Sequence, residues 1–456
     1  MMKNIFLLLL LVSSISSAQH KIKGTLHPKP KTDWIILYKI EGTKQVFINN
    51  ASIKSDSLKI SKKREVVGTF EITLPPSAKS GAYRVTYATE VAGFVDFFYN
   101  KEDIYFIFNP AFPDRTISFT KSEENISYKK YLDEIGALQE TLDSIQGAVL
   151  QNPALKKNDT YKKILSTINK VQNKYLELSK NKYIEPFVKA FLRNNSPEIE
   201  TFADNYMNNL KNNYFDKIDF SNKTLINSQF LTDRISDYVF YLHYSDDQNM
   251  QQNLYKEGIK TVILKIKNQS YQKEIIEYLI SQFESSKNVE IIDYLFEKHY
   301  NALPETLQDK KFKTEKLAFF ATEIGRIAPD FSWTEKGGKM KLSSLNESEN
   351  YVLVFWSTSC SHCLLEIPQL HTFLKNKKNI KVIAFALEKD AFVWKNFSKT
   401  NLYGWHNVLG LKKWENEVAK TYKIVSTPSY FVLNKNKKII AKPEEMEGLK
   451  ALFEKK

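Results

Sequence analysis

The chain contains two cysteines, Cys360 and Cys363, and no others in its 456 residues. They follow an unbroken apolar run over residues 351–356, which predicts a strand buried on both faces, and they precede a helix predicted over residues 361–375. This spacing places the two sulfur atoms one helical turn apart, and a helix N-terminus lowers the pKa of the first thiol. The pattern indicates a reversible dithiol and disulfide pair.

The first residues of the chain predict export. Lys3 precedes an apolar run over residues 5–12 and a stretch of small residues that ends at Ala18, which is the composition of a cleaved secretory signal peptide. The apolar run is far shorter than the roughly 20 residues that span a bilayer, so a retained anchor is the less favoured alternative. We expect a signal peptide over residues 1–18 and a mature protein in the periplasm. Exported proteins commonly use cysteines in structural disulfides, so a chain with this pair alone keeps both thiols for chemistry.

The charge and cysteine patterns argue against a nucleic-acid partner and against a bound metal ion. The net charge is +14, but only six of the 66 basic residues are arginine, the residue that most often reads phosphates and bases. We expect no nucleic-acid partner and at most a weak association with anionic membrane surfaces. A structural zinc site usually has four protein ligands. A zinc site at the two cysteines would need His362, His371 or His406 as further ligands. We expect neither a metal nor another cofactor.

Three regions of different periodicity follow the signal peptide. Short β-rich runs between glycine and proline turns predict a β-rich, sandwich-like module over residues 19–121. Apolar residues at steps of three and four then predict an α-helical module over residues 122–325, with an antiparallel helical hairpin over residues 128–178. Pairing of one hairpin seam with a second subunit is the alternative. Strands that alternate with helices predict an α/β domain over residues 326–456, so the fold class is multidomain α+β.

Several motifs of the last region occur together and in a fixed order: Ala328-Pro-Asp-Phe331, Leu342-Ser-Ser-Leu345, Phe355-Trp356, Cys360-x-x-Cys363, Glu366-x-Pro368 and Thr427-Pro428. On these motifs, residues 328–455 resemble the thioredoxin-like disulfide oxidoreductases of bacterial periplasms, the TlpA/ResA type. The resemblance implies a thioredoxin-like fold for about the last quarter of the chain, behind a β-rich and helical extension. It also implies an enzyme that exchanges disulfides with protein thiols and receives electrons from a membrane-bound donor.

The resemblance assigns roles to the motif positions. Cys360 would be the attacking thiolate that forms the mixed disulfide, and Cys363 would be the resolving thiol. Pro428 matches the family's cis-proline, and the backbone of Thr427 would hold the substrate as an added strand. Trp356 is expected beside them in the substrate site.

Three further positions bear on proton transfer and on the rim of the site. Glu366 lies on the helix face of Cys363 and matches an acidic residue of the family that can relay the proton of this thiol, although a solvated glutamate is the alternative. Val354 stands where cytoplasmic thioredoxin has a buried aspartate, which leaves Glu366 as the nearest proton acceptor. Ser359 replaces the tryptophan that many relatives have before the first cysteine, so the rim is smaller and more polar.

The direction of electron flow depends on His362. A histidine between the cysteines stabilises the Cys360 thiolate and makes the disulfide a stronger oxidant, which favours an oxidase or isomerase, whereas the family pattern with Glu366 favours a reductase. We place the reduction of protein disulfides first. A partner-binding surface protein with a secondary redox domain is the alternative from another class. A peroxiredoxin-type peroxidase is disfavoured, because it needs Pro and Thr where this chain has Leu353 and Ser357.

Overall fold

The computed structural model describes residues 19–60, 63–88, 93–400 and 403–454. The chain divides into two compact units, of which the first ends at Ile275 and the second begins at Ile276. This boundary falls within helix α9 (Gln269–Ser285), inside the stretch that we expected as one helical module. The signal peptide predicted over residues 1–18 lies outside the described residues. In the part of the chain that is described, no helix has both the length and the apolar character needed to cross a membrane.

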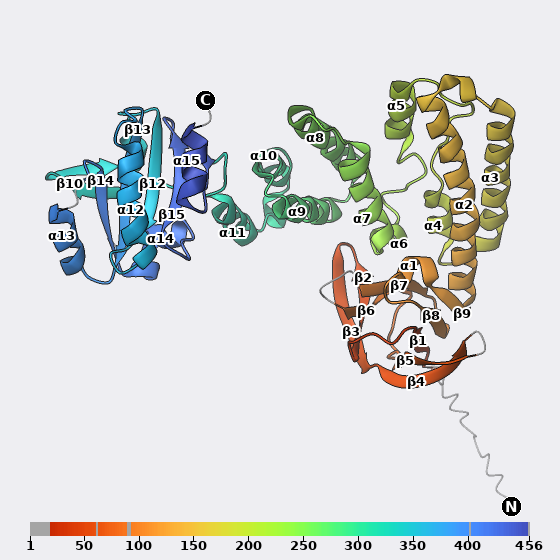
Figure 1. Ribbon diagram of the computed structural model, residues 1–456. Helices are drawn as coiled ribbons and strands as arrows, with labels where there is room; N and C mark the ends of the chain where they lie inside the picture. Colours follow the sequence, from red (N-terminus) through yellow and green to blue (C-terminus); the bar gives the residue numbers. More distant parts are fainter. Residues whose placement is uncertain (1–18, 61–62, 89–92, 401–402, 455–456) are drawn as a thin grey trace, which may run out of the picture. The chain divides into compact units, whose positions relative to one another are not determined.

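The strands of the first unit form two sheets (Figure 1). One sheet has the order β4-β5-β1-β8-β9, and the other has the order β3-β2-β6-β7. Neighbouring strands are antiparallel, apart from the parallel pair of β1 and β8. The strands are β1 (Lys21–Leu26), β2 (Trp34–Glu41), β3 (Lys44–Ser52), β4 (Lys54–Ile60), β5 (Lys63–Thr73), β6 (Gly81–Ala88), β7 (Gly93–Tyr99), β8 (Ile104–Phe108) and β9 (Ser118–Lys121).

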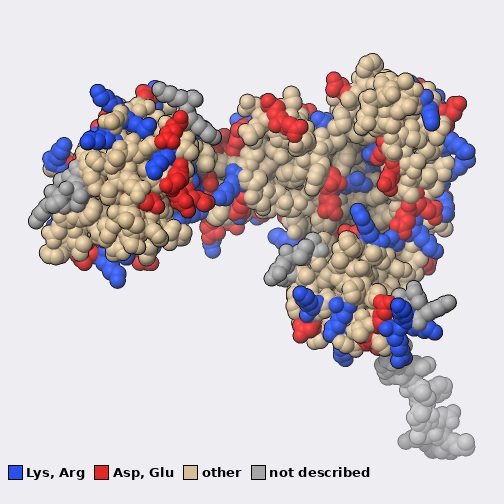
Figure 2. Space-filling view, in the orientation of Figure 1, with Lys and Arg blue, Asp and Glu red and all other residues tan. Residues whose placement is uncertain are grey.

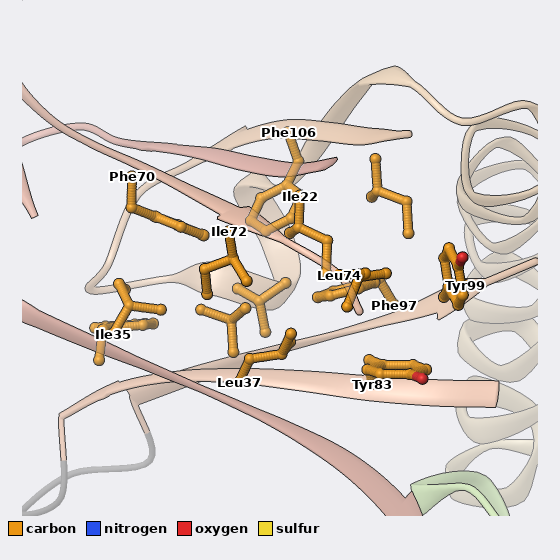
Figure 3. Close-up of a cluster of buried hydrophobic side chains, with 14 of the residues drawn as sticks. Ile22, Ile35, Leu37, Phe70, Ile72, Leu74, Tyr83, Phe97, Tyr99 and Phe106 are labelled. Carbon is orange, nitrogen blue, oxygen red and sulfur yellow. The ribbon is translucent and has the colours of Figure 1, made fainter. Parts of the chain in front are cut away.

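One hydrophobic core lies between the inner faces of these two sheets (Figure 3). Ile22 and Phe70 from one sheet meet Leu37 and Tyr83 from the other. Every second residue of β1 is buried, as expected for a strand with one face on a core. Gly24 allows the close approach of Phe70, because a Cβ atom at this glycine would lie 2.0 Å from Cε1 of the ring.

The remainder of the first unit is helical. The long helices α2 (Glu123–Gln151) and α3 (Asn158–Ser179) lie side by side (Figure 1), and their apolar seams share one buried cluster. The hydroxyl of Tyr131 on α2 donates to Oε1 of Gln172 on α3 at 2.6 Å. The other helices are α1 (Pro113–Thr116), α4 (Glu185–Phe191), α5 (Ala203–Asn213), α6 (Lys223–Ile226), α7 (Gln229–Ser236), the π-helical segment η2 (Asp237–Leu242) and α8 (Gln248–Lys265).

Asn125 fastens the start of α2 to the edge strand β7. The backbone N–H of Phe98 donates to Oδ1 of Asn125 at 2.8 Å, and Nδ2 of Asn125 donates to the carbonyl oxygen of Phe98 at 2.6 Å. This buried amide makes the two hydrogen bonds that a neighbouring strand would otherwise make with β7. The first turn of α2 is therefore held against the sheet.

The second unit contains a five-stranded sheet with the order β14-β13-β12-β15-β16. The middle strand, β12, is parallel to β13 and antiparallel to β15. The helices before the sheet are α10 (Val289–Tyr294), the π-helical segment η3 (Leu295–His299) and α11 (Lys310–Phe320). Then follow β10 (Ser332–Glu335), β11 (Gly338–Lys341), β12 (Asn350–Trp356), α12 (Ser361–Leu374), β13 (Ile380–Glu388), α13 (Ala391–Thr400), β14 (His406–Leu411), α14 (Glu417–Thr421), β15 (Ser429–Asn434), β16 (Ile439–Ala441) and α15 (Met446–Glu454).

Alternate residues of β12 enter two separate cores. Phe355 packs with Tyr422 and the other residues on the α14 side of the sheet. Val354 lies on the opposite side, with residues of α12 and α15. All residues from Tyr351 to Trp356 are buried, which confirms the prediction of a strand covered on both faces. The dithiol segment thus follows the middle strand of the sheet, which is buried over its last six residues.

Charged side chains of both signs are mixed on the face of the molecule in Figure 2. Lysines and arginines lie between aspartates and glutamates over this face, with uncharged surface around them. The net charge of +14 is therefore not concentrated in one basic patch on this face.

Candidate active site

Cys360 lies at the N-terminus of α12, as its N-cap residue. Its Sγ accepts a hydrogen bond from the backbone N–H of Cys363 at 3.3 Å and lies 3.2 Å from the carbonyl oxygen of Thr427, to which the thiol donates. Burial by itself raises the pKa of the Cys360 thiol. Hydrogen bonds from the Cys363 thiol and from the backbone N–H groups of Cys363 and His362 outweigh this effect, so the pKa lies below that of an ordinary cysteine. Cys360 is therefore the thiol more readily converted to a nucleophile.

Cys363 differs from Cys360 in its burial and in the direction of its pKa shift. It is fully buried, whereas Cys360 is partly exposed, and both are free thiols. Burial, followed by the hydrogen bond with Cys360, raises the pKa of Cys363 to about 12. An external disulfide can reach the first thiol but not the second. The geometry thus separates a partly exposed thiol with a lowered pKa from a buried thiol with a raised pKa.

The loop before β15 lies against the dithiol. The peptide bond between Thr427 and Pro428 is cis, as expected from the family resemblance. The carbonyl oxygen of Thr427 contacts Sγ of Cys360, while Ser429, the next residue after Pro428, pairs with Phe355 near the end of β12. Exposed apolar side chains flank both segments, with Val425 at 89% exposure and Leu365 at 64%.

Glu366 is engaged by a tyrosine that the sequence analysis did not single out. The hydroxyl of Tyr430 donates to Oε2 of Glu366 at 2.6 Å. Tyr430 is 2% exposed and belongs to the same buried cluster as Cys363. Burial and, next, the Glu366 carboxylate raise the pKa of Tyr430, so its hydroxyl remains protonated. Tyr430 therefore contacts Glu366 and packs in the same buried cluster as Cys363.

Glu388, the last residue of β13, holds the loop that precedes Cys360. Its side chain is 5% exposed, and Oε1 accepts the backbone N–H of Thr358 at 2.6 Å. The next residues of the loop are fixed locally, since Ser359 N–H donates to Ser357 Oγ and Cys360 N–H donates to the Ser357 carbonyl. The available signal in the sequence was a carboxylate directly after the apolar run of residues 382–387, because such a residue is rarely buried without a partner.

Two residues expected in the site have positions that change their interpretation. Trp356 is 3% exposed and packs on Phe397, with ring centroids 5.2 Å apart. Its side chain thus lies beneath the dithiol segment, and the expected substrate contact does not fit this burial. The side chain of His362 is exposed, and its backbone N–H is what bears on the Cys360 thiol.

The other histidines that could have completed a metal site are engaged elsewhere. His371 stacks on Tyr403 with ring centroids 4.2 Å apart. His406 is hydrogen-bonded through its two ring nitrogens to Glu335 and Glu347. Within the described ranges, no group of three or more His, Cys, Asp or Glu side chains is arranged to hold a metal ion.

The fold and the site together define a class of protein. A central sheet covered on both faces carries a dithiol at a helix N-terminus, and a cis-proline loop lies against the exposed sulfur. These are the features of a thioredoxin-like thiol-disulfide oxidoreductase.

Comparison with known proteins gives the same assignment. Residues 324–442 match the AhpC/TSA family. Thiol-disulfide oxidoreductase ResA of Bacillus thuringiensis subsp. konkukian is 30% identical over 139 residues, which cover 30% of this chain and 73% of the relative. ResA of Bacillus anthracis is 27% identical over 135 residues, covering 28% of this chain and 76% of the relative. The solved structure of a thiol-disulfide oxidoreductase from Bacteroides fragilis is 27% identical, covering 28% of this chain and 97% of that structure with a TM-score of 0.26.

The chain belongs to the family of thioredoxin-like thiol-disulfide oxidoreductases that includes ResA, and it is an oxidoreductase. The positions that a peroxiredoxin-type peroxidase needs as Pro and Thr hold Leu353, which is fully buried in β12, and Ser357, whose hydroxyl is hydrogen-bonded to Ser359 at 3.0 Å. The residues of the site thus favour disulfide exchange over peroxide reduction.

Proposed function

We propose that this protein is an exported reductase of protein disulfides that works through a mixed disulfide on Cys360. The observation that carries the proposal is the contrast between the two thiols. Cys360 is accessible with a lowered pKa, whereas Cys363 is fully buried with a raised pKa. A single accessible thiolate ensures that attack on a substrate always begins at the same sulfur.

The reaction balances as two thiol-disulfide exchanges. The Cys360 thiolate attacks a substrate disulfide, a sulfur–sulfur bond forms to Cys360, and one substrate sulfur leaves as a thiolate. Cys363 then loses its proton and attacks Sγ of Cys360, which releases the second substrate thiolate and leaves a Cys360–Cys363 disulfide. The substrate gains two electrons, and its two thiolates take up protons. A membrane-bound donor of thiol electrons would return the enzyme to the dithiol form.

Substrate binding and proton transfer use the residues around the pair. The backbone of Thr427, next to Pro428, would bind the substrate as an added strand, which its contact with Cys360 supports. Glu366 would receive the proton of Cys363, with Tyr430 positioning the carboxylate. The shared buried cluster of Tyr430 and Cys363 supports this route.

The direction of electron flow follows from the reduction potential. A reduction potential of about −270 mV is typical of a protein that reduces disulfides, and one of about −120 mV is typical of a protein that oxidises thiols strongly. We place the reductase first, with an oxidase or isomerase as the alternative, because the exposed His362 ring leaves only its backbone N–H to favour the thiolate. Equilibration of the full chain with glutathione redox buffers measures the value, and a potential near the oxidant end would reverse this order.

We also propose a cellular location for the protein and a role for its N-terminal extension. We infer that residues 1–18 are a signal peptide cleaved near Ala18, that the mature protein works in the periplasm, and that any contact with membrane surfaces is weak. Residues 19–121 would form a β-sandwich module and residues 122–325 a helical module, and together these would bind a partner. The shared core of the two N-terminal sheets supports the first of these assignments.

Trapping of the mixed disulfide tests the mechanism. Replacement of the resolving thiol (Cys363→Ala) in the full chain should stall covalent complexes on Cys360 in periplasmic extracts. The matched control, with Cys360→Ala added, should capture none. Complexes that persist in the control, or an absence of complexes with Cys363→Ala, would count against the reductase and favour a binding protein with a secondary redox domain.

A further inference from the structure

A cavity of about 350 Å³ lies in the first unit, in a part of the chain that does not carry the dithiol. Residues from β6, β7, α1, β9, α2, α4 and α7 line it, together with Ile117 between α1 and β9 and Ser228 before α7. Its volume is within the roughly 300–1,000 Å³ of small-ligand sites. Asn125, which fastens α2 to β7, also lines the cavity, so its walls are held together by hydrogen bonds.

One side of this cavity is aromatic. Phe98 lies 4.4 Å from Phe187 and 5.2 Å from Tyr128, measured between ring centroids. Phe187 in turn meets Phe230 at 5.9 Å. The guanidinium of Arg234 already lies over the Phe230 ring, 5.3 Å from its centroid, which leaves Phe98 and Tyr128 for a ligand. Phe187 is fully packed, whereas the other three rings are partly exposed. Ring faces and edges turned to a hollow can bind an apolar group, and the faces also attract a cation.

The other side of the cavity is acidic. Asp96, Asp114 and Asp233 line it, and all three also line an adjoining hollow of about 270 Å³. Asp96 is already neutralised, because Arg84 donates two hydrogen bonds of 2.6 Å to its carboxylate. In the described part of the chain, Asp233 accepts only from the neutral amide of Gln229, at 2.7 Å, and neither Asp233 nor Asp114 has an ion-pair partner.

The one lysine on the wall does not supply the missing charge. Lys129 lines the cavity, but its Nζ is paired with Asp133 at 2.6 Å. Asp114 and Asp233, both solvent-exposed, are therefore two carboxylates beside the aromatic wall that have no ion-pair partner among the described residues. This local excess of negative charge occurs in a chain whose net charge is +14, so an excess of acidic residues over the whole chain does not explain it.

We propose that the cavity binds a guanidinium or ammonium group carried on an apolar or aromatic body. The aromatic wall would bury the body, and Asp233 with Asp114 would accept hydrogen bonds from the cationic end, as charge-assisted bonds are the stronger kind. An anionic ligand of the same shape would meet two unpaired carboxylates. The cation could come from a small organic amine or from an arginine or lysine side chain of a polypeptide.

Isothermal titration of the full chain with four probes tests this assignment. The probes are benzamidine, its neutral analogue benzamide, the blocked peptide acetyl-Phe-Arg-amide and the same peptide with citrulline in place of arginine. Benzamidine should bind at least tenfold more tightly than benzamide. Binding of the arginine peptide over the citrulline peptide identifies a polypeptide side chain as the source, and binding of benzamidine alone identifies a small amine.

Three variants locate the site. Asp233→Asn should weaken the binding of the cationic probe about tenfold. The control Asp204→Asn, which removes the same charge from an exposed position on α5, should leave it unchanged. Ile117→Trp should block the hollow without changing its charge, and circular dichroism verifies that each variant is folded. Equal binding of the charged and neutral probes, no binding of any probe at millimolar concentration, or equal effects of Asp233→Asn and Asp204→Asn would overturn the proposal.

Discussion

Replacement of Glu388 should loosen the loop that presents Cys360. One hydrogen bond connects this carboxylate to the backbone N–H of Thr358, at 2.6 Å, and the side chain is 5% exposed. A hydrogen bond to a charged group stabilises by about 1.5–3 kcal/mol. Because about 1.4 kcal/mol corresponds to a factor of ten, Glu388→Ala should raise the local opening equilibrium of the loop by roughly 10- to 100-fold. Glu388→Gln keeps a neutral acceptor whose hydrogen bond contributes about 1 kcal/mol. The net loss is then about 0.5–2 kcal/mol, so the equilibrium should rise by only about 2- to 30-fold.

Amide hydrogen exchange of the reduced full chain measures this effect at the peptide that contains Thr358. The matched control is Glu349→Ala in the same unit, whose side chain is 69% exposed and lies 3.9 Å from Lys435. Surface changes of this kind stay within about 0.5 kcal/mol, so exchange at Thr358 should not respond. If the amide of Thr358 exchanges at the same rate in Glu388→Ala and in Glu349→Ala, the hydrogen bond to Glu388 does not restrain the loop.

Two further predictions concern the protons of the dithiol. If Glu366 accepts the Cys363 proton, Glu366→Gln should slow resolution of the mixed disulfide by about 100-fold, the lower end of general base catalysis, and Tyr430→Phe should slow it less because the carboxylate remains. Stopped-flow reduction of a model disulfide measures the rate of each variant. Unchanged rates in both variants would contradict a proton relay through Glu366. The alkylation rate of Cys360 by iodoacetamide should rise with pH with a midpoint below about 8.5, the pKa of a free cysteine, because a lowered pKa populates the reactive thiolate at lower pH. Cys363 should stay unmodified over this range because its pKa is about 12, and a midpoint for Cys360 at or above that of a free thiol would contradict the assignment.

The dithiol could be recognised from the sequence because its residues are neighbours. Cys360, Cys363 and the apolar strand before them form one continuous segment, and the helix start fixes which thiol is exposed. Tyr430 and Glu388 could not be placed in this way. Their contacts, with Glu366 and Thr358, join segments that are far apart in the chain, and no local periodicity encodes which strand lies beside which helix.

Burial at strand ends was equally hard to predict. The aromatic pair Phe355-Trp356 suggested a side chain at the surface of the site, but the strand remains covered up to its last residue, and α13 lies over Trp356 through Phe397. Coverage by a helix some forty residues later leaves no trace in the sequence of the strand itself.

In the N-terminal region, the β-rich runs predicted a module of strands without fixing every strand. β4 is hard to recognise because it is an edge strand whose side chains are largely polar and exposed, so it has no apolar face to produce an alternation. β14, an edge strand of the C-terminal sheet, is hard to recognise for another reason. Its Gly410 reads as a breaker in sequence, yet a Cβ there would lie 2.2 Å from Cε1 of Phe385, and the glycine is needed for close packing.

The interior position of β1 has a consequence for how the N-terminal sheet can be completed. Ile22 pairs with Ile72 of β5 on one side and with Ile104 of β8 on the other. During synthesis from the N-terminus, β1 emerges before β5 and β8, and one of its edges has no partner strand until β8 is available. A chain shortened past Leu26 would leave β5 and β8 as two open edges, with backbone groups free to pair with other molecules. Loss of this short strand should therefore lead to self-association rather than to a smaller folded module.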